Sequence, residues 1–300
     1  MPVAPDPHFA FDSFADPHRL VTTQWLSANI GTHGLKIIEA NDDTQLYDIG
    51  HVPGAIKLNC RRDLNNPITR DYIDGTRFTE LMRAKGIERD DTVVIYGDRS
   101  NTQASHTAWI FTLFGHADVR LLDGGRAAWL SEERDTTFEP AHLGRSDYPA
   151  VHRDDAARAF RDDVLAHLGK PLIDVRTPAE YRGARTEPDD HHDAAAMRGG
   201  HVPGAANIPW TEALTSGGRF RSRGELDEVY RAVGERDEVM VYSHIGVRSS
   251  HTWFVLTHLL GRDNVRNYDG SWTEWGNTVR MPIVMGDEPG VVAADVVRGG

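Results

Sequence analysis

The chain has 300 residues, a formal net charge of −12, 39% hydrophobic residues and a single cysteine, Cys60. The length suits two domains with cores of their own, and the acidic balance argues against a general binder of nucleic acid or anionic membranes. One cysteine excludes intrachain disulfides and cysteine-based zinc sites, and no apolar run approaches the ~20 residues of a membrane span. The N-terminus lacks the pattern of a secretory signal, which predicts a cytoplasmic protein.

Short apolar strands alternate with helical segments along both halves of the chain. In the first half, strands are predicted at 35–39, 55–58, 93–96 and 119–122, and helices at 78–85 and 105–114. In the second half, strands are predicted at 171–176, 205–208, 239–242 and 265–268, and helices at 225–233 and 250–260. This alternation is typical of an α/β fold with a mostly parallel sheet.

Three motifs recur in the same order in the two halves. The run GHVPGA at 50–55 recurs at 200–205, and the strand that ends at Tyr96 recurs as the strand that ends at Tyr242. The run DGG at 123–125 recurs as DGS at 269–271, which is the same spacing of 146 positions that separates the two tyrosines. The chain is therefore a tandem duplication, with predicted domains at 1–145 and 156–300. A charged, proline-containing linker is predicted near 131–155, and the polar stretch 183–200 is predicted to be a surface insertion.

The strongest candidate site follows the strand 239–242. A loop of about six residues, Ser243 to Arg248, leads from this strand into a helix. A strand that turns sharply into a helix aims backbone N–H groups at one point, and the helix start adds partial positive charge. The loop is therefore predicted to hold an anion, and Arg248 would add a full charge with a planar set of donors.

These segments resemble the two-domain rhodaneses, the thiosulfate and 3-mercaptopyruvate sulfurtransferases, and in particular the actinobacterial type. The likeness covers nearly the whole chain and includes both GHVPGA runs, DVR at 174–176 with Glu180-Tyr181, the Ser243 loop and YDGSWTEWG at 268–276. It implies tandem rhodanese-like domains, each an α/β unit with a mostly parallel sheet flanked by helices. The N-terminal copy is expected to be structural, with Gly97 at the nucleophile position, and the C-terminal copy is expected to carry the active-site loop.

The resemblance also implies an activity without a cofactor or a metal. Sulfane sulfur would pass from thiosulfate or 3-mercaptopyruvate to a thiophilic acceptor such as cyanide, through a persulfide at the position of Ser243. The residues implied to bind the donor anion are Arg248, Arg182, His244, Ile245, Gly246 and Val247, with Arg185 as a further candidate. The residues implied to brace the loop are Asp174, Arg176, Glu180 and Ser249.

Serine at position 243 departs from the family pattern, which has cysteine there. A hydroxyl is far less acidic and far less thiophilic than a thiol, and it cannot hold a stable persulfide. The chain as written is therefore expected to bind a donor anion without turning it over. The sequence leaves open whether Ser243 is natural or an engineered replacement of cysteine.

Two other functions remain compatible with the sequence. One is a catalytically silent module that binds anions or regulates, and the other is a repurposed biosynthetic enzyme that uses no thiol. A hydrolase built on Ser243 and His244 is disfavoured because no orienting acid is evident.

Several other residues are predicted to have structural roles. Cys60 is expected to be a small buried packing residue, with a reactive thiol as the alternative. His51 and His201 of the GHVPGA runs are expected to be held by backbone hydrogen bonds. His191 and His192, in an acidic stretch, are expected to be solvated rather than metal ligands.

Overall fold

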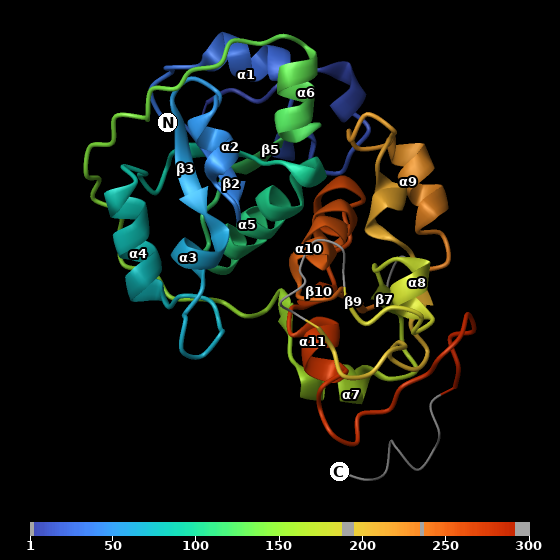
Figure 1. The fold of residues 1–300 in the computed structure, drawn as a ribbon. Coiled ribbons are helices and arrows are strands. Elements are labelled where there is room, and N and C mark those ends of the chain that lie inside the picture. Colours follow the sequence, from blue (N-terminus) through green and yellow to red (C-terminus); the bar gives the residue numbers. More distant parts are fainter. Residues whose placement is uncertain (1–2, 188–194, 235–236, 292–300) are drawn as a thin grey trace. The chain divides into compact units, whose positions relative to one another are not determined.

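The computed structural model describes residues 3–187, 195–234 and 237–291, and the chain divides into two units (Figure 1). Unit 1 consists of Met1–Asp154 with Thr215–Phe220, and unit 2 consists of Asp155–Leu214 with Arg221–Gly300. The boundary between Asp154 and Asp155 falls at the end of the predicted linker. His191 and His192 lie outside the described residues.

Unit 1 is built on a five-stranded parallel sheet with the strand order β1-β5-β4-β2-β3. Its strands are β1 (Leu20–Val21), β2 (Leu35–Asn41), β3 (Ala55–Asn59), β4 (Thr92–Tyr96) and β5 (Val119–Leu122). The helices that flank it include α1 (Thr23–Asn29), α2 (Gln45–Asp48), α3 (Cys60–Leu64), α4 (Gly75–Ala84), α5 (Thr102–Leu113) and α6 (Gly125–Ser131). Figure 1 shows α5 running beside the strands of this sheet.

Unit 2 repeats this plan with the strand order β6-β10-β9-β7-β8, again all parallel. Its strands are β6 (Arg158–Ala159), β7 (Leu172–Asp174), β8 (Ala206–Asn207), β9 (Val239–Tyr242) and β10 (Val265–Tyr268). The helices are α7 (Arg161–His167), α8 (Pro178–Tyr181), α9 (Arg223–Val229), α10 (Val247–Phe254) with a π-helical continuation (Val255–Leu259), and α11 (Ser271–Trp275). The predicted duplication and the α/β fold class are both confirmed.

The central strands are buried in both units, as parallel sheets covered by helices require. Every residue of β4 and of β9 is buried. The two cores use matching aromatic residues, with Tyr96 and Trp129 in unit 1 and Tyr242 and Trp275 in unit 2. This hydrophobic packing holds β9 rigidly, and β9 in turn fixes where the following loop begins.

The element boundaries differ from the prediction where a capping side chain decides them. Helix α4 begins at Gly75 rather than 78 because Asp74 accepts a hydrogen bond from the N–H of Arg77 at 2.8 Å. Helix α9 begins at Arg223 and ends at Val229, and Glu225 closes a capping box onto Ser222. The two-residue edge strands β1 and β6 were not predicted because they are too short to show a pattern. Among the described residues, none of the helices combines the length and the hydrophobicity that a membrane span requires.

Candidate active site

Strand β9 leads into the Ser243 loop, residues 243–248, and one glycine shapes the turn. Gly246 has a φ of 84°, and a Cβ at this position would lie 2.7 Å from the Cα atom of Asp269. The left-handed backbone and the close approach both require glycine. Helix α10 begins at the next residue, Val247, three residues earlier than predicted, so the last two residues of the loop already belong to the first turn of the helix.

The side chain of Ser243 is buried inside its own loop, with 1% of the residue exposed. Its Oγ accepts a hydrogen bond from the N–H of Gly246 at 3.1 Å and lies 3.2 Å from the Oγ of Ser249. An atom in this place therefore contacts a backbone donor and a hydroxyl, two groups that stabilise negative charge.

Further backbone donors of the loop remain available. Among the residues that the structure describes, the N–H groups of Ile245, Val247 and Ser249 have no hydrogen-bond acceptor. For Val247 and Ser249 these are unsatisfied donors of the first turn of α10. Donors of this kind are suited to hold an anion.

Arg248 forms a buried ion pair with Glu180. Its Nη1 and Nη2 lie 2.9 and 3.1 Å from the two carboxylate oxygens, and both side chains are less than a tenth exposed. Glu180 is held in turn by Thr177, which it caps at the start of α8. Burial opposes ionisation of Glu180, but the hydrogen bond and charge of Arg248 outweigh it and lower the pKa of this carboxyl group. The charge of Arg248 is therefore already balanced, and an anion in the loop would share this guanidinium with Glu180.

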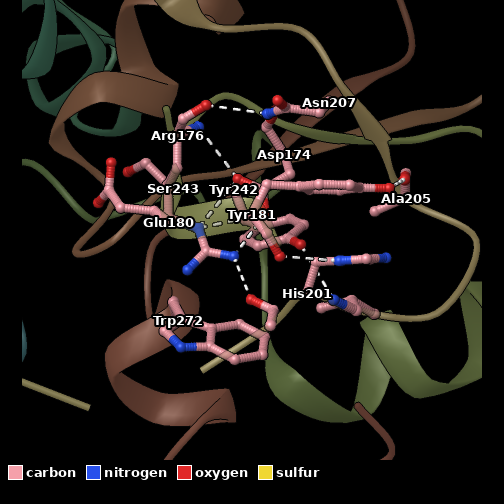
Figure 2. A network of polar contacts seen from close by, with 12 residues as sticks. Asp174, Arg176, Glu180, Tyr181, His201, Ala205, Asn207, Tyr242, Ser243 and Trp272 are labelled. Carbon is pink, nitrogen blue, oxygen red and sulfur yellow. Dashed lines mark hydrogen bonds and ion pairs between the residues drawn. The ribbon is translucent and has the colours of Figure 1, made fainter. Parts of the chain in front are cut away.

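A second buried ion pair lies at the end of β7 (Figure 2). Arg176 donates to Asp174 at 2.6 Å through Nη2 and to the carbonyl of Gly200 at 2.7 Å. Its guanidinium lies 4.4 Å from the ring centre of Trp272. Burial alone would lower the pKa of Arg176, but the carboxylate of Asp174 raises it above its usual value, so the guanidinium stays charged. Asp174 with Arg176 and Glu180 with Arg248 are thus two neighbouring ion pairs in unit 2, and only the second includes a residue of the loop.

Unit 1 has a similar polar centre built from different residues. Glu39 accepts hydrogen bonds from the hydroxyl of Tyr96 at 2.5 Å and from Nη1 of Arg126 at 3.1 Å. Arg126 also donates to the carbonyl of Gly50 at 2.5 Å. Glu39 lies beside Tyr96 in the sheet register, as Asp174 lies beside Tyr242.

The guanidinium reaches this centre from a different place in each unit. Arg126 of unit 1 corresponds to Trp272 of unit 2 at the repeat spacing of 146 positions. In unit 2 the guanidinium belongs to Arg176, two residues after Asp174 at the end of β7, and it lies over the ring of this tryptophan. Sequence reasoning missed Arg126, although the repeat alignment would have placed it opposite a tryptophan of the recognised YDGSW run.

Of the other residues predicted to bind the donor, His244 and Ile245 lie in the loop, whereas Arg182 and Arg185 lie outside it. His244 is buried, and its carbonyl accepts hydrogen bonds from the N–H and Oγ of Thr273 at 3.0 and 2.8 Å. Ile245 is partly exposed. Arg182 is exposed at the end of α8, and among the described residues no hydrogen bond or ion pair joins its side chain to the Ser243 loop. Arg185 is exposed as well.

The histidines of the GHVPGA runs and Cys60 are placed as predicted. His201 contacts the carbonyl oxygens of Tyr181 and Glu288 through its two ring nitrogens, at 2.9 and 3.2 Å, and His51 makes the matching backbone contacts in unit 1. Cys60 is buried with its Sγ 3.4 Å from the Oγ of Thr107, and burial raises the pKa of this thiol. A thiol in this state is a packing group rather than a nucleophile.

Two tandem α/β units, one with a tight strand–loop–helix turn at Ser243, define the class of protein. Residues 22–132 and 156–278 both match the model of the rhodanese-like domain. The chain therefore belongs to the rhodanese family.

The similar proteins span nearly the full chain. It is 58% identical over 294 residues to "Putative thiosulfate sulfurtransferase SseA" of Mycobacterium tuberculosis, covering 97% of this chain and 99% of that protein. It is 52% identical to the thiosulfate sulfurtransferase of Corynebacterium glutamicum, with 94% and 95% covered. It is 44% identical to the sulfur carrier protein TtuD of Thermus thermophilus, with 92% and 99% covered. The solved structure of YnjE has the same fold, with a TM-score of 0.81 at 22% identity over 95% of this chain and 71% of that chain.

Proposed function

We propose that this chain has the scaffold of a thiosulfate sulfurtransferase whose reacting position is residue 243. The observation that carries the proposal is the loop itself. Its side-chain position at the end of β9 is buried against the N–H of Gly246 and the Oγ of Ser249. Relatives that are 52% and 58% identical bear the name thiosulfate sulfurtransferase, which supports thiosulfate as the donor.

With cysteine at position 243, the chemistry is a double displacement. The thiolate attacks the outer sulfur of thiosulfate, the S–S bond of the donor breaks, and sulfite leaves with the electron pair. Cyanide then attacks the outer sulfur of the persulfide, thiocyanate leaves, and the thiolate is regenerated. The amides of Ile245 and Val247 would stabilise negative charge on the reacting sulfur or on the donor, and they are already in place before the donor binds.

Serine at position 243 stops the first step. Its proton is held far more tightly than that of a thiol, and its oxygen has low affinity for sulfur. The loop amides and the helix start remain, so binding of the anion does not depend on the thiol. We expect the chain as written to bind thiosulfate or sulfite without releasing thiocyanate.

Binding without turnover is the second candidate function, and it rests on the loop donors that are present with serine at position 243. EanB has the same fold as this chain, with TM-scores near 0.8 at 22% identity. One EanB structure carries a persulfide on a cysteine, and a variant with serine in place of that cysteine forms a complex with hercynine. This complex shows only that a protein of this fold binds a ligand when serine replaces its persulfide cysteine. The repurposed enzyme that uses no thiol has no such support.

Four further parts complete the proposal. Arg182 and His244 are candidate contacts for the donor, and the partners are a small sulfur-donating anion and a thiophilic acceptor. A cytoplasmic setting without nucleic acid is proposed from the acidic charge and the single unpaired cysteine. Unit 1 is proposed to be structural.

The test compares thiocyanate formation by the unsubstituted chain and by Ser243→Cys, each with thiosulfate and cyanide. Cys60→Ser in both backgrounds removes the only other thiol. We expect activity only in the Ser243→Cys variant, with one sulfur bound per chain, detected by mass spectrometry. Thiocyanate formation by the unsubstituted chain, or none by a folded Ser243→Cys variant, would overturn the proposal. Titration of the unsubstituted chain with sulfite, monitored by calorimetry, tests the silent binding function separately.

A further inference from the structure

Ser271, the first residue of α11, has an unusual conformation for a residue with a side chain. Its φ is 53°, in the left-handed region that favours glycine, and it is completely buried. Such a conformation costs free energy and persists only where the surroundings demand it, and strained residues of this kind gather at functional sites.

The hydroxyl of Ser271 connects two backbone segments. It donates to the carbonyl of Tyr268 at 2.8 Å and accepts the N–H of Ser243 at 3.1 Å. The next residue, Trp272, donates its N–H to the carbonyl of Ser243 at 3.1 Å. Both backbone polar groups of Ser243 are therefore held by the first two residues of α11.

Unit 1 has only half of this arrangement. The residue that corresponds to Ser271 is Gly125, which has a similar φ of 56° but no hydroxyl. Arg126 donates its N–H to the carbonyl of Gly97 at 2.9 Å, as Trp272 does to Ser243. The N–H of Gly97 instead goes to the side chain of Asn101 at 2.9 Å. The carbonyl contact is thus common to both units, and the hydroxyl contact occurs only where the reacting position has a side chain.

We propose that Ser271 is a positioning residue that fixes the direction of the side chain at position 243. With its N–H and its carbonyl both held, residue 243 cannot rotate, so its Cβ points into the loop and its terminal atom lies by the N–H of Gly246. The expected effect of Ser271 on sulfur transfer rests on the proposed function, whereas its hydrogen bond to the N–H of Ser243 does not.

Two substitutions separate positioning from stability. Ser271→Ala keeps the strained backbone and removes the hydroxyl, whereas Ser271→Gly removes both. Gly125 shows that glycine is accommodated at this position of the fold. Ser271→Gly should therefore unfold a few degrees above Ser271→Ala, because glycine adopts a positive φ without strain. The two variants should nevertheless lose the positioning effect equally.

The first measurement uses both substitutions in the Ser243→Cys, Cys60→Ser background. In each variant we expect kcat to fall by about 10- to 100-fold, because misplacement of a reacting atom by about 1 Å has this effect. The pH at which the thiol introduced at position 243 becomes half-reactive toward iodoacetamide should rise in both variants, because the thiolate loses its alignment with the loop amides. If Ser271 had only a structural role, the activity of the two variants would follow their thermal stability, and Ser271→Ala would be less active than Ser271→Gly. That result, or unchanged kcat and alkylation profiles in both variants, would overturn the proposal.

The second measurement uses Ser243 as it stands and needs no activity. Amide hydrogen exchange at Ser243, followed by NMR, should accelerate at least tenfold in Ser271→Ala and Ser271→Gly, since its acceptor is gone. The amide of Gly97, held by Asn101, is the internal control and should not change. Unchanged exchange at Ser243 would refute the geometric inference. Accelerated exchange together with an inactive Ser243→Cys parent would instead refute the proposed function and leave the geometry intact.

Discussion

Glu180→Gln tests how strongly the buried ion pair braces the Ser243 loop. The side chains of Glu180 and Arg248 are only 4% and 7% exposed, and two hydrogen bonds join them. Removing one charge from a buried pair costs about 3–5 kcal/mol, because the other charge is left uncompensated. Glutamine keeps the shape and can still cap Thr177, so we expect the lower end, about 3 kcal/mol. For a domain of this size that loss lowers Tm by about 6–12 °C.

The assay is equilibrium urea unfolding at pH 7, followed by tryptophan fluorescence, with a double-mutant cycle. Arg248→Met removes the partner charge, and the double variant should be less destabilised than the sum of the single variants, since no unpaired charge remains. Glu225→Gln is the matched control. Glu225 also closes a capping box, at the start of α9, but it is exposed and its contact with Arg221 is long, at 3.4 Å. This variant should unfold close to the unsubstituted protein.

The contribution of Glu180 should also depend on pH in one direction. Its pKa is lower in the folded protein than the ordinary value of 4.5. The stabilisation is therefore fully present above about pH 4.5 and is lost as the pH falls through the lower folded-state value. Unfolding curves of the unsubstituted chain and Glu180→Gln should converge in this acidic range. A loss below about 1 kcal/mol at neutral pH, or additive single variants, would refute the bracing role.

Three other substitutions or probes test the described geometry. Gly246→Ala should destabilise unit 2 by about 2 kcal/mol or more in urea unfolding, since it combines a strained φ with a steric clash. Gly54→Ala is the control, because Gly54 has a similar φ of 78° but open space around it, and this variant should cost about 1 kcal/mol. Asp174→Asn should cost about 3 kcal/mol or more by leaving the charge of Arg176 uncompensated, and a loss within about 1 kcal/mol would contradict this. Cys60 is buried and the pKa of its thiol is raised, so at about pH 7 it should react with a maleimide only as fast as unit 1 unfolds locally. Rapid labelling of the folded chain would contradict the burial of Cys60.

The sequence predicted the parts of the fold that depend on local pattern and on the repeat. The central strands, the α/β class and the site of the loop followed from apolar runs and from motifs at matching spacing. The helix after the loop was predicted from residue 250, whereas α10 starts at Val247 and becomes π-helical from Val255. Val247, Arg248 and Ser249 were assigned to the loop, because the residue pattern does not show where the loop ends and helical geometry begins.

The contacts that define the site could not be predicted because they join distant segments. Glu180 and Arg248 are 68 positions apart, and nothing in their local sequence shows that they pair. The left-handed φ of Ser271 is invisible as well, since serine has no preference for it. Only the alignment with Gly125, where glycine accepts this φ freely, contained a signal for that conformation.

Comparison of the two loops explains why a thiol at the matching position of unit 1 would not create a second site. In unit 1 the side chain of Asn101 occupies the loop, where it accepts the N–H of Gly97 and donates to the carbonyl of Leu122 at 2.7 Å. A Cβ on Gly97 would lie 2.6 Å from the carbonyl oxygen of Ala40. The three residues before α5 all have positive φ values, whereas unit 2 needs one left-handed residue, Gly246, before α10 starts. Unit 1 therefore differs from unit 2 both in the backbone path of the loop and in the space beside residue 97, so a thiol alone would not give unit 1 the loop that unit 2 has.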